Sequence, residues 1–179
     1  MAVGIESGSE RVQKLIQKKV TVEKIREQAA MIEGCTKIKI TGYFMIGFLD
    51  ETGEEIWETI QIARELPLVS ANFNLETPLP GTAMFDEALR EGRLQLDRIN
   101  WDTCTSDQIA FRRNHVSGER LIQLRRQAYL RFYGRLWDVL KTATSNTEVM
   151  RAIFKKVRML SRRSETVHRI PLCLRESES

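Results

Sequence analysis

The sequence predicts an α/β protein built on a parallel sheet, and two observations lead to this prediction. Segments of strand and helix character alternate in the order β, α, β, α, β within about 80 residues, which is the pattern of right-handed βαβ crossovers. Residues 37–46 become continuously apolar after a short alternation, which is typical of a strand buried on both faces. Three strands would leave an open edge, so we expect half of a larger α/β barrel or doubly wound sheet.

The first elements are predicted from capping residues and apolar spacing. Residues 2–6 have strand character, and Ser9 is a candidate N-cap for a short helix. Thr21 is a second candidate N-cap, followed by an apolar stripe at helical spacing. Gly34 is the expected end of that helix. Because no turn precedes residues 2–6, we expect the chain to begin inside an element.

The next two strands enclose a well-marked helix. Gly47 ends the apolar strand, and Thr52-Gly53-Glu54-Glu55 has the pattern of a capping box. The helix that it opens ends before Pro67. Residues 69–75 alternate apolar and polar side chains, which predicts a third strand.

The remainder of the chain is predicted to be helical and partly irregular. A short helix spans residues 82–90, and a long amphipathic helix begins at Ser117 and ends near Leu140. A second capping box, Ser145-Asn146-Thr147-Glu148, opens a basic helix. The predicted organisation is a sheet domain at 1–91, an irregular linker at 92–116, a basic helical extension at 117–163 and a flexible tail at 164–179.

Composition limits the class of protein. The chain has 179 residues, of which 42% are hydrophobic and 29% charged, as in ordinary globular domains. It has no run of 18 apolar residues and no leader-like N-terminus. Cys35, Cys104 and Cys173 are widely spaced, which argues against a disulfide framework or a local metal site. We therefore expect a cytoplasmic protein.

The charges are unevenly distributed. Residues 1–109 hold 12 basic and 18 acidic side chains, whereas residues 110–179 hold 16 basic and 6 acidic ones. The basic segment could contact nucleic acid or an anionic membrane surface. A solvated helix face, or one packed on an acidic neighbour, is the favoured interpretation, and nucleic acid is not the expected partner. The basic residues of this segment include Lys155, Lys156, Arg158, Arg162 and Arg163.

The chain holds no complete catalytic set of a recognised type. It has no P-loop and no HExxH motif, and His115 and His168 are expected to be surface residues. Several glycines, Gly47 among them, lie at predicted strand ends. Because ligands of parallel α/β proteins bind at the carboxyl ends of the strands, we expect any site to lie there.

The segments at these strand ends resemble a known family. Residues 4–12 (GIESGSERV), 43–52 (YFMIGFLDET) and 77–82 (TPLPGT) look like the fourth, fifth and sixth strand segments of radical S-adenosylmethionine (SAM) enzymes. The run at residues 121–133 looks like the helix after the barrel in their cobalamin-dependent branch, which includes the magnesium-protoporphyrin ester cyclases. The resemblance covers roughly residues 1–140.

The resemblance implies a fold, a cofactor set and an incomplete enzyme. The fold would be the C-terminal half of a partial (β/α)₆, TIM-like barrel, whose missing N-terminal half would be a partner. A [4Fe–4S] cluster, SAM and possibly cobalamin would serve the intact parent, which would generate a 5′-deoxyadenosyl radical and act on a small-molecule substrate. The CxxxCxxC cluster motif is absent from this chain, so the fragment would be inactive alone.

The resemblance also implies cofactor contacts. Glu6 and Ser7 would contact the ribose or amino-acid part of SAM, with helix capping as the alternative role for Glu6. Lys18 would lie near the SAM carboxylate, or be a solvated lysine. Met45, Ile46 and Gly47 would line the adenine. Leu49-Asp50 replaces the Pro-Gly that relatives commonly have there, which puts the shape of this loop in doubt.

The third predicted strand adds polar candidates. Asn72, Asn74 and Glu76 alternate toward one face, where they would contact substrate or cofactor in a barrel, or water otherwise. Asn74 is included among the expected cofactor-binding residues. Two other functions remain open: a fragment of an RNA methylthiotransferase, and a noncatalytic α/β interaction module with a basic tail.

Overall fold

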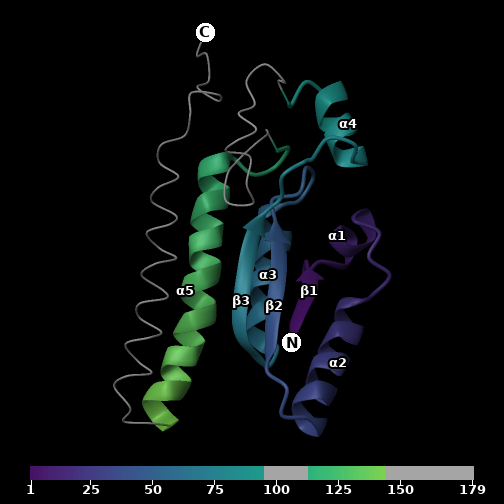
Figure 1. Cartoon of the computed structure of the whole chain (residues 1–179). Helices are drawn as coiled ribbons and strands as arrows, with labels where there is room; N and C mark the ends of the chain where they lie inside the picture. The colour runs from purple at the N-terminus through teal and green to yellow at the C-terminus, as the bar shows by residue number, and fades with distance from the viewer. Residues whose placement is uncertain (95–112, 144–179) are drawn as a thin grey trace.

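A three-stranded parallel sheet forms the centre of the molecule (Figure 1). The computed structural model describes residues 1–94 and 113–143. Strands β1 (Ala2–Glu6), β2 (Ile40–Ile46) and β3 (Leu68–Leu75) lie side by side in sequential order, and both strand pairs are parallel. The predicted α/β class with a parallel sheet is therefore confirmed.

Five helices accompany the sheet in the part of the chain that the structure describes. They are α1 (Glu10–Leu15), α2 (Val22–Cys35), α3 (Gly53–Glu65), α4 (Ala83–Arg90) and α5 (Gly118–Ala143). Helices α1 and α2 connect β1 to β2, and α3 connects β2 to β3. The carboxyl ends of the strands, marked by the arrowheads in Figure 1, point toward α4.

The predicted helix starts agree with the observed caps at three helices. The side chains of Thr21, Thr52 and Thr82 each accept a hydrogen bond from the third amide of their helix, and Glu55 completes the capping box of α3. Ser9 precedes α1 without a capping hydrogen bond. The prediction that Gly34 ends α2 is wrong, because the helix continues to Cys35.

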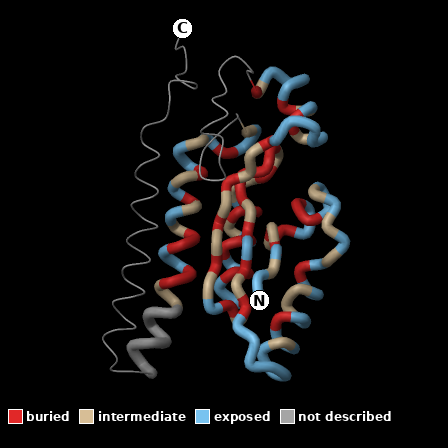
Figure 2. Tube along the Cα trace, viewed as in Figure 1, coloured by how far each residue is buried: buried red, intermediate tan, exposed pale blue. Residues whose placement is uncertain are grey.

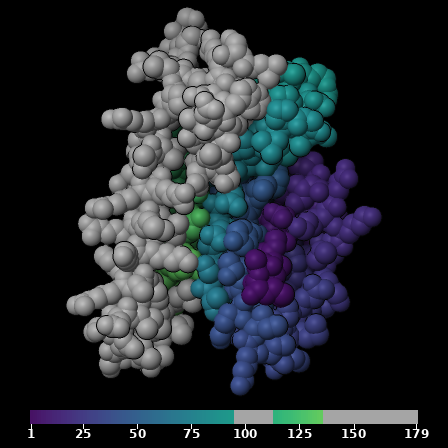
Figure 3. Space-filling view, in the orientation of Figure 1, coloured from purple at the N-terminus to yellow at the C-terminus, as the bar shows by residue number. Residues whose placement is uncertain are grey.

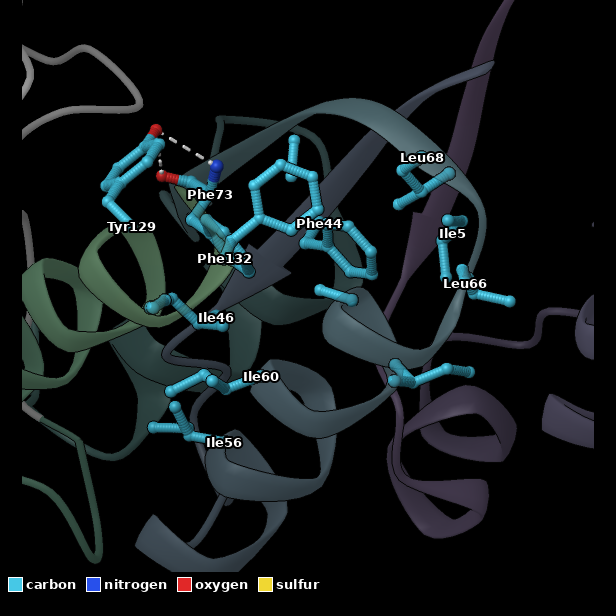
Figure 4. Close-up of a cluster of buried hydrophobic side chains, with 14 of the residues drawn as sticks. Ile5, Phe44, Ile46, Ile56, Ile60, Leu66, Leu68, Phe73, Tyr129 and Phe132 are labelled. Atoms are coloured by element: carbon cyan, nitrogen blue, oxygen red, sulfur yellow. Dashed lines mark hydrogen bonds between the residues drawn. The ribbon is translucent and has the colours of Figure 1, made fainter. Parts of the chain in front are cut away.

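One face of the sheet carries the hydrophobic core. Side chains from α2, α3 and α5 pack with this face in a single buried cluster. Phe44 and Phe73, neighbours in the β2–β3 register, stack with ring centroids 5.1 Å apart, and Figure 4 shows them between the helices and strands that supply the core. This cluster holds the three helices on the same side of the sheet.

The other face of the sheet carries polar side chains together with Tyr43 and Met45, and no described helix packs against it. Buried and less buried residues alternate along β2 and β3 (Figure 2). Tyr43 is 41% exposed, and its register neighbour Asn72 is partly exposed. The prediction that residues 37–46 are buried on both faces is therefore wrong for the described chain, because Tyr43 and Met45 point to this open face rather than to a second helical layer.

The free edge of β3 is covered by side chains of α5. Tyr129 Oη lies 3.1 Å from the amide nitrogen of Phe73 and accepts its hydrogen bond, and Arg125 Nε donates to the Phe73 carbonyl at 2.8 Å. Tyr133 donates to the carbonyl of Ala71 at 3.3 Å. These bonds satisfy backbone groups that an edge strand would otherwise expose.

The free edge of β1 is not covered in the part of the chain that the structure describes. Strand β1 pairs with β2 alone, and the amide of Thr41 donates to the carbonyl of Met1. Because neighbouring residues of a strand direct their backbone groups to opposite edges, Ala2 and Gly4 face away from β2. Both residues are exposed, and Figure 3 shows the start of the chain, in purple, at the surface.

Several predictions lie outside the described residues. These are most of the linker 92–116, the helix opened by Ser145-Asn146-Thr147-Glu148, the tail 164–179, and the side chains of Cys104, His168 and Cys173. The division of the chain into domains stays a prediction. None of the described helices combines the length and the apolar character needed to cross a membrane.

Candidate functional site

The carboxyl ends of the three strands bring polar side chains together at the open face. Glu6 ends β1, and Asn74 lies beside Met45 in the β2–β3 register. Glu76 follows β3, and its amide donates to the carbonyl of Ile46 at 2.9 Å. In parallel α/β proteins this edge is the usual position for ligands, so we take it as the candidate site.

The backbone at Glu6 has an unusual conformation. Its φ angle is +70°, which non-glycine residues rarely adopt, and the β1–β2 register shifts between Gly4 and Glu6. The buried amide of Gln13 donates to the carbonyls of Ile5 and Ser7, at 2.8 and 2.5 Å. Gln13 therefore holds both peptides beside Glu6, and strained residues fixed in this way are found at functional sites.

Glu6 and Lys18 form an ion pair above Gly4. Lys18 Nζ lies 2.9 Å from Glu6 Oε1, and both side chains are about one-third exposed or less. A Cβ at Gly4 would lie 2.8 Å from the same carboxylate oxygen. The absence of a side chain at Gly4 thus leaves room for the pair on the open face.

A second carboxylate lies at the same edge. Burial raises the pKa of Glu76, and the negative charge of Glu6 raises it further. The nearby Arg113 guanidinium acts in the opposite direction and lowers this pKa. The site therefore combines two carboxylates, one ammonium group and the amide of Asn74, a set that can bind a polar ligand carrying charges of both signs.

The peptide of Gly47 is fixed on both sides at the end of β2. Its N–H donates to Glu51 Oε2, its carbonyl accepts from Arg113 Nε, and its φ angle is +87°. Burial raises the pKa of Glu51 to about 7. A Cβ at Gly47 would lie 2.6 Å from Leu121 Cδ2 and 2.7 Å from Arg113 Nε, so both conformation and space require glycine here.

Two of the expected site residues do not reach the open face. Ser7 is fully buried, with its hydroxyl 3.1 Å from the hydroxyl of Thr59 on α3. Ile46 is also fully buried, in the core cluster on the helix-covered side. The structure thus places Glu6, Lys18, Met45 and Asn74 on one face, with Gly47 at its rim, and directs Ser7 and Ile46 toward the helices.

A charged network joins the loops that follow β1 and β2. Arg11 donates to both carboxylate oxygens of Glu55, at 2.6 and 2.7 Å, and to the carbonyl of Asp50 at 2.6 Å. Ser9 also donates to Glu55. The hydrogen bonds from Arg11 lower the pKa of Glu55 to about 2. The network therefore fixes the spacing of two strand-end loops.

Sequence reasoning missed Gln13, Glu51 and Arg113. Glu51 follows the strand-ending Gly47 by four residues, and this short spacing is a usable signal for a carboxylate that binds loop amides. Gln13 and Arg113 act through contacts formed only in the folded chain, so no local pattern identifies them. His115 is exposed, and among the described residues no three His, Cys, Asp or Glu side chains form a group suited to a metal ion.

Comparisons with known proteins found relatives that are named as methyltransferases. The chain is 34% identical, over 132 residues, to an uncharacterized methyltransferase of Pyrococcus horikoshii, and 27% identical, over 135 residues, to the bacteriochlorophyllide d C-12(1)-methyltransferase of Chlorobaculum tepidum. The matches cover 73% and 72% of this chain but 28% of each relative. No protein-family model matches the chain.

These comparisons correct the function expected from the strand-end motifs. Both relatives are named for methyl transfer, which contradicts the expected radical SAM enzyme with its iron–sulfur cluster, cobalamin and deoxyadenosyl radical. The RNA methylthiotransferase and the noncatalytic interaction module are not supported either. The motif residues have local structural roles, such as the left-handed turn at Gly47 and the contact of Ser7 with α3, and such roles do not specify a reaction.

Proposed function

We propose that this chain is a SAM-binding part of a methyltransferase, with the candidate site at the strand ends as the binding surface. The observation that carries the proposal is the 34% identity, over 132 residues, to a protein named as a methyltransferase. Because the chain spans 28% of that relative, the remaining parts of the active site and the small-molecule methyl acceptor would lie with other segments.

The residues at the site fit the chemistry of the methyl donor. SAM carries a sulfonium ion, an ammonium group, a carboxylate and a ribose, and when bound it would supply the methyl group. Glu6 can accept hydrogen bonds from ribose hydroxyls or the ammonium group, and Lys18 can bind the carboxylate. Met45 and Gly47 offer a thioether and a fixed backbone to the adenine. The Glu6–Lys18 ion pair fills the space above Gly4, and its two side chains keep 26% and 33% of their surface exposed.

We further propose that the sheet is part of a barrel. The order β1-β2-β3 with its core on one face also fits half of a doubly wound sheet. A doubly wound sheet, however, has helices on both faces and apolar side chains toward both. The open face here carries Glu6, Asn72 and Asn74, and this polarity favours an interior that binds a ligand.

Binding of SAM to the 179-residue chain, measured by isothermal titration calorimetry, tests the proposed function. Wild type is expected to bind, and Glu6→Gln and Lys18→Met are each expected to weaken binding about tenfold, because each removes a charge-assisted contact. Matched controls are Glu23→Gln and Lys24→Met, which change exposed residues of α2 and should bind like wild type.

Two results would count against the proposal. One is absence of SAM binding by a wild-type chain that is folded by circular dichroism. The other is equal affinity for the site variants and the α2 controls. Transfer of a labelled methyl group needs the remaining parts of the active site and the acceptor as well. A bacteriochlorophyllide is the first acceptor to test, because one relative is named for such a substrate.

A further inference from the structure

Two charged residues, Glu51 and Arg113, meet at the peptide of Gly47. Glu51 Oε2 accepts hydrogen bonds from the amides of Gly47 and Phe48, the latter at 3.2 Å, and the Glu51 side chain is fully buried. Arg113 donates to the Gly47 carbonyl and, at 2.9 Å, to the carbonyl of Glu76. One guanidinium group thus connects the ends of β2 and β3.

The segment that carries Arg113 is itself attached to the same loop. The amide of Asn114 donates to the carbonyl of Leu49 at 3.0 Å, and the Asn114 side chain donates to the Asp50 carboxylate. A guanidinium group can bridge two carbonyls in this way because its donors are arranged in a rigid, planar fork. A lysine at this position would present one compact charge and would not reproduce both contacts.

We propose that Arg113 is a positioning residue for the ligand-binding loop, acting with Glu51 to fix the Gly47 peptide and its distance from the end of β3. This inference rests on the proposed function, because that function assigns the backbone of Gly47 to the ligand. Arg113 does not need to touch the ligand in this role. It fixes the orientation of the Gly47 peptide, which would line the adenine.

The charges around Glu51 give this role a distinct signature. Glu51 faces Arg113, which lowers its pKa, and Glu55, which raises it, while Arg113 also faces Glu76. Removing Arg113 should therefore move the titration of Glu51 to higher pH. Removing a residue that only filled space near the loop would instead expose Glu51 to water and move its titration to lower pH, because burial is the main cause of its raised pKa.

Nuclear magnetic resonance of the 179-residue chain tests the proposal with Arg113→Met, Arg113→Lys and Arg120→Met. In wild type the Gly47 amide signal is expected to titrate with a midpoint of about 7. In Arg113→Met the midpoint should rise and hydrogen exchange at Gly47 and Phe48 should become about tenfold faster. In Arg113→Lys the titration midpoint of the Gly47 signal should stay closer to that of wild type, because the positive charge is kept. Hydrogen exchange at Gly47 and Phe48 should still be faster than in wild type. Arg120→Met, which changes an exposed residue, should match wild type, and Glu51→Gln should abolish the titration.

The affinity for S-adenosylhomocysteine separates the proposed SAM-binding function from the positioning role of Arg113. Arg113→Met should bind it about tenfold more weakly than Arg120→Met. Absence of binding by wild type would refute the proposed function, whereas the exchange and titration data would still decide the role of Arg113. Unchanged exchange and an unchanged midpoint in both Arg113 variants would overturn the positioning role. If Arg113→Met fails to fold, the rate of hydrogen exchange at Gly47 and Phe48 in Arg113→Lys tests the positioning role by itself.

Discussion

The two edges of the sheet differ in how they are covered by the described chain. At the β3 edge, side chains of α5 bind backbone groups from Leu66 to Phe73 and pack on the core. At the β1 edge, the described chain provides no such cover, and Ala2 and Gly4 remain exposed. Among the described residues, α5 therefore closes the β3 edge, whereas no element covers the β1 edge.

The same contrast extends to the strand ends. The ends of β2 and β3 are joined by Arg113 through two backbone carbonyls. The end of β1 is joined to its surroundings by side-chain networks, through Arg11 with Glu55 and Lys18 with Glu6. Stability on the β3 side should therefore depend on buried packing, whereas stability on the β1 side should depend on charge and pH.

The largest expected effect is on the β3 side. Tyr129 is buried, and its ring meets that of Phe73 edge to face with centroids 5.2 Å apart (Figure 4). Tyr129→Ala removes this packing and both hydrogen bonds to Phe73, so the free energy of unfolding should fall by about 3–5 kcal/mol. The matched control is Leu130→Ala, at a site 47% exposed, which should cost less than about 0.5 kcal/mol. Similar urea denaturation midpoints for the two variants would show that α5 does not secure this edge.

A smaller effect, dependent on pH, is expected on the β1 side. The pKa of Glu55 is about 2 in the folded chain, against an ordinary value of 4.5 for the unfolded chain. The unfolded state therefore binds more protons than the folded state between pH 2 and pH 4.5. The stabilisation by Glu55 is therefore present above pH 4.5 and is lost as pH falls toward 2. Because Arg11 is half exposed, we expect Glu55→Gln to cost about 1–2 kcal/mol at pH 7.

Thermal denaturation from pH 2 to 7 measures this difference. The gap between wild type and Glu55→Gln should narrow as the pH is lowered. Glu58→Gln changes an exposed residue of the same helix and serves as the control. A gap that stays constant over this range would contradict the assignment of the stabilisation to the Glu55 carboxylate.

The smallest expected effect concerns the strained end of β1. Glu6→Gly and Glu6→Ala both remove the carboxylate, but only glycine adopts a φ of +70° without a steric penalty. The glycine variant should therefore be about 1 kcal/mol more stable than the alanine variant. At Lys14, within α1, the order of the same two variants should be reversed. Equal stabilities at position 6 would show that the backbone there carries no strain.

Local sequence patterns predicted much of the fold and less of the site. The capping box of Thr52 and Glu55 predicted the start of α3, and Gly47 predicted the end of β2. Both signals could be read from the sequence because their contacts join residues at most four positions apart. The face that Ser7 and Ile46 occupy could not be predicted, because it depends on how β1 and β2 pair and on where α3 packs. Arg113 lies 66 residues from its partner Gly47, and the sequence holds no periodic signal that connects them.

The cover over β3 has an evolutionary consequence. The side chains of Arg125, Tyr129 and Tyr133 bind carbonyl and amide groups of β3 that any residue type except proline would supply. Asn72 and Asn74 on the open face can therefore change without loss of these bonds. New ligand preferences could be acquired at these two positions by single substitutions while the folded scaffold is retained, so this half of the sheet is well suited to diversification and to directed evolution.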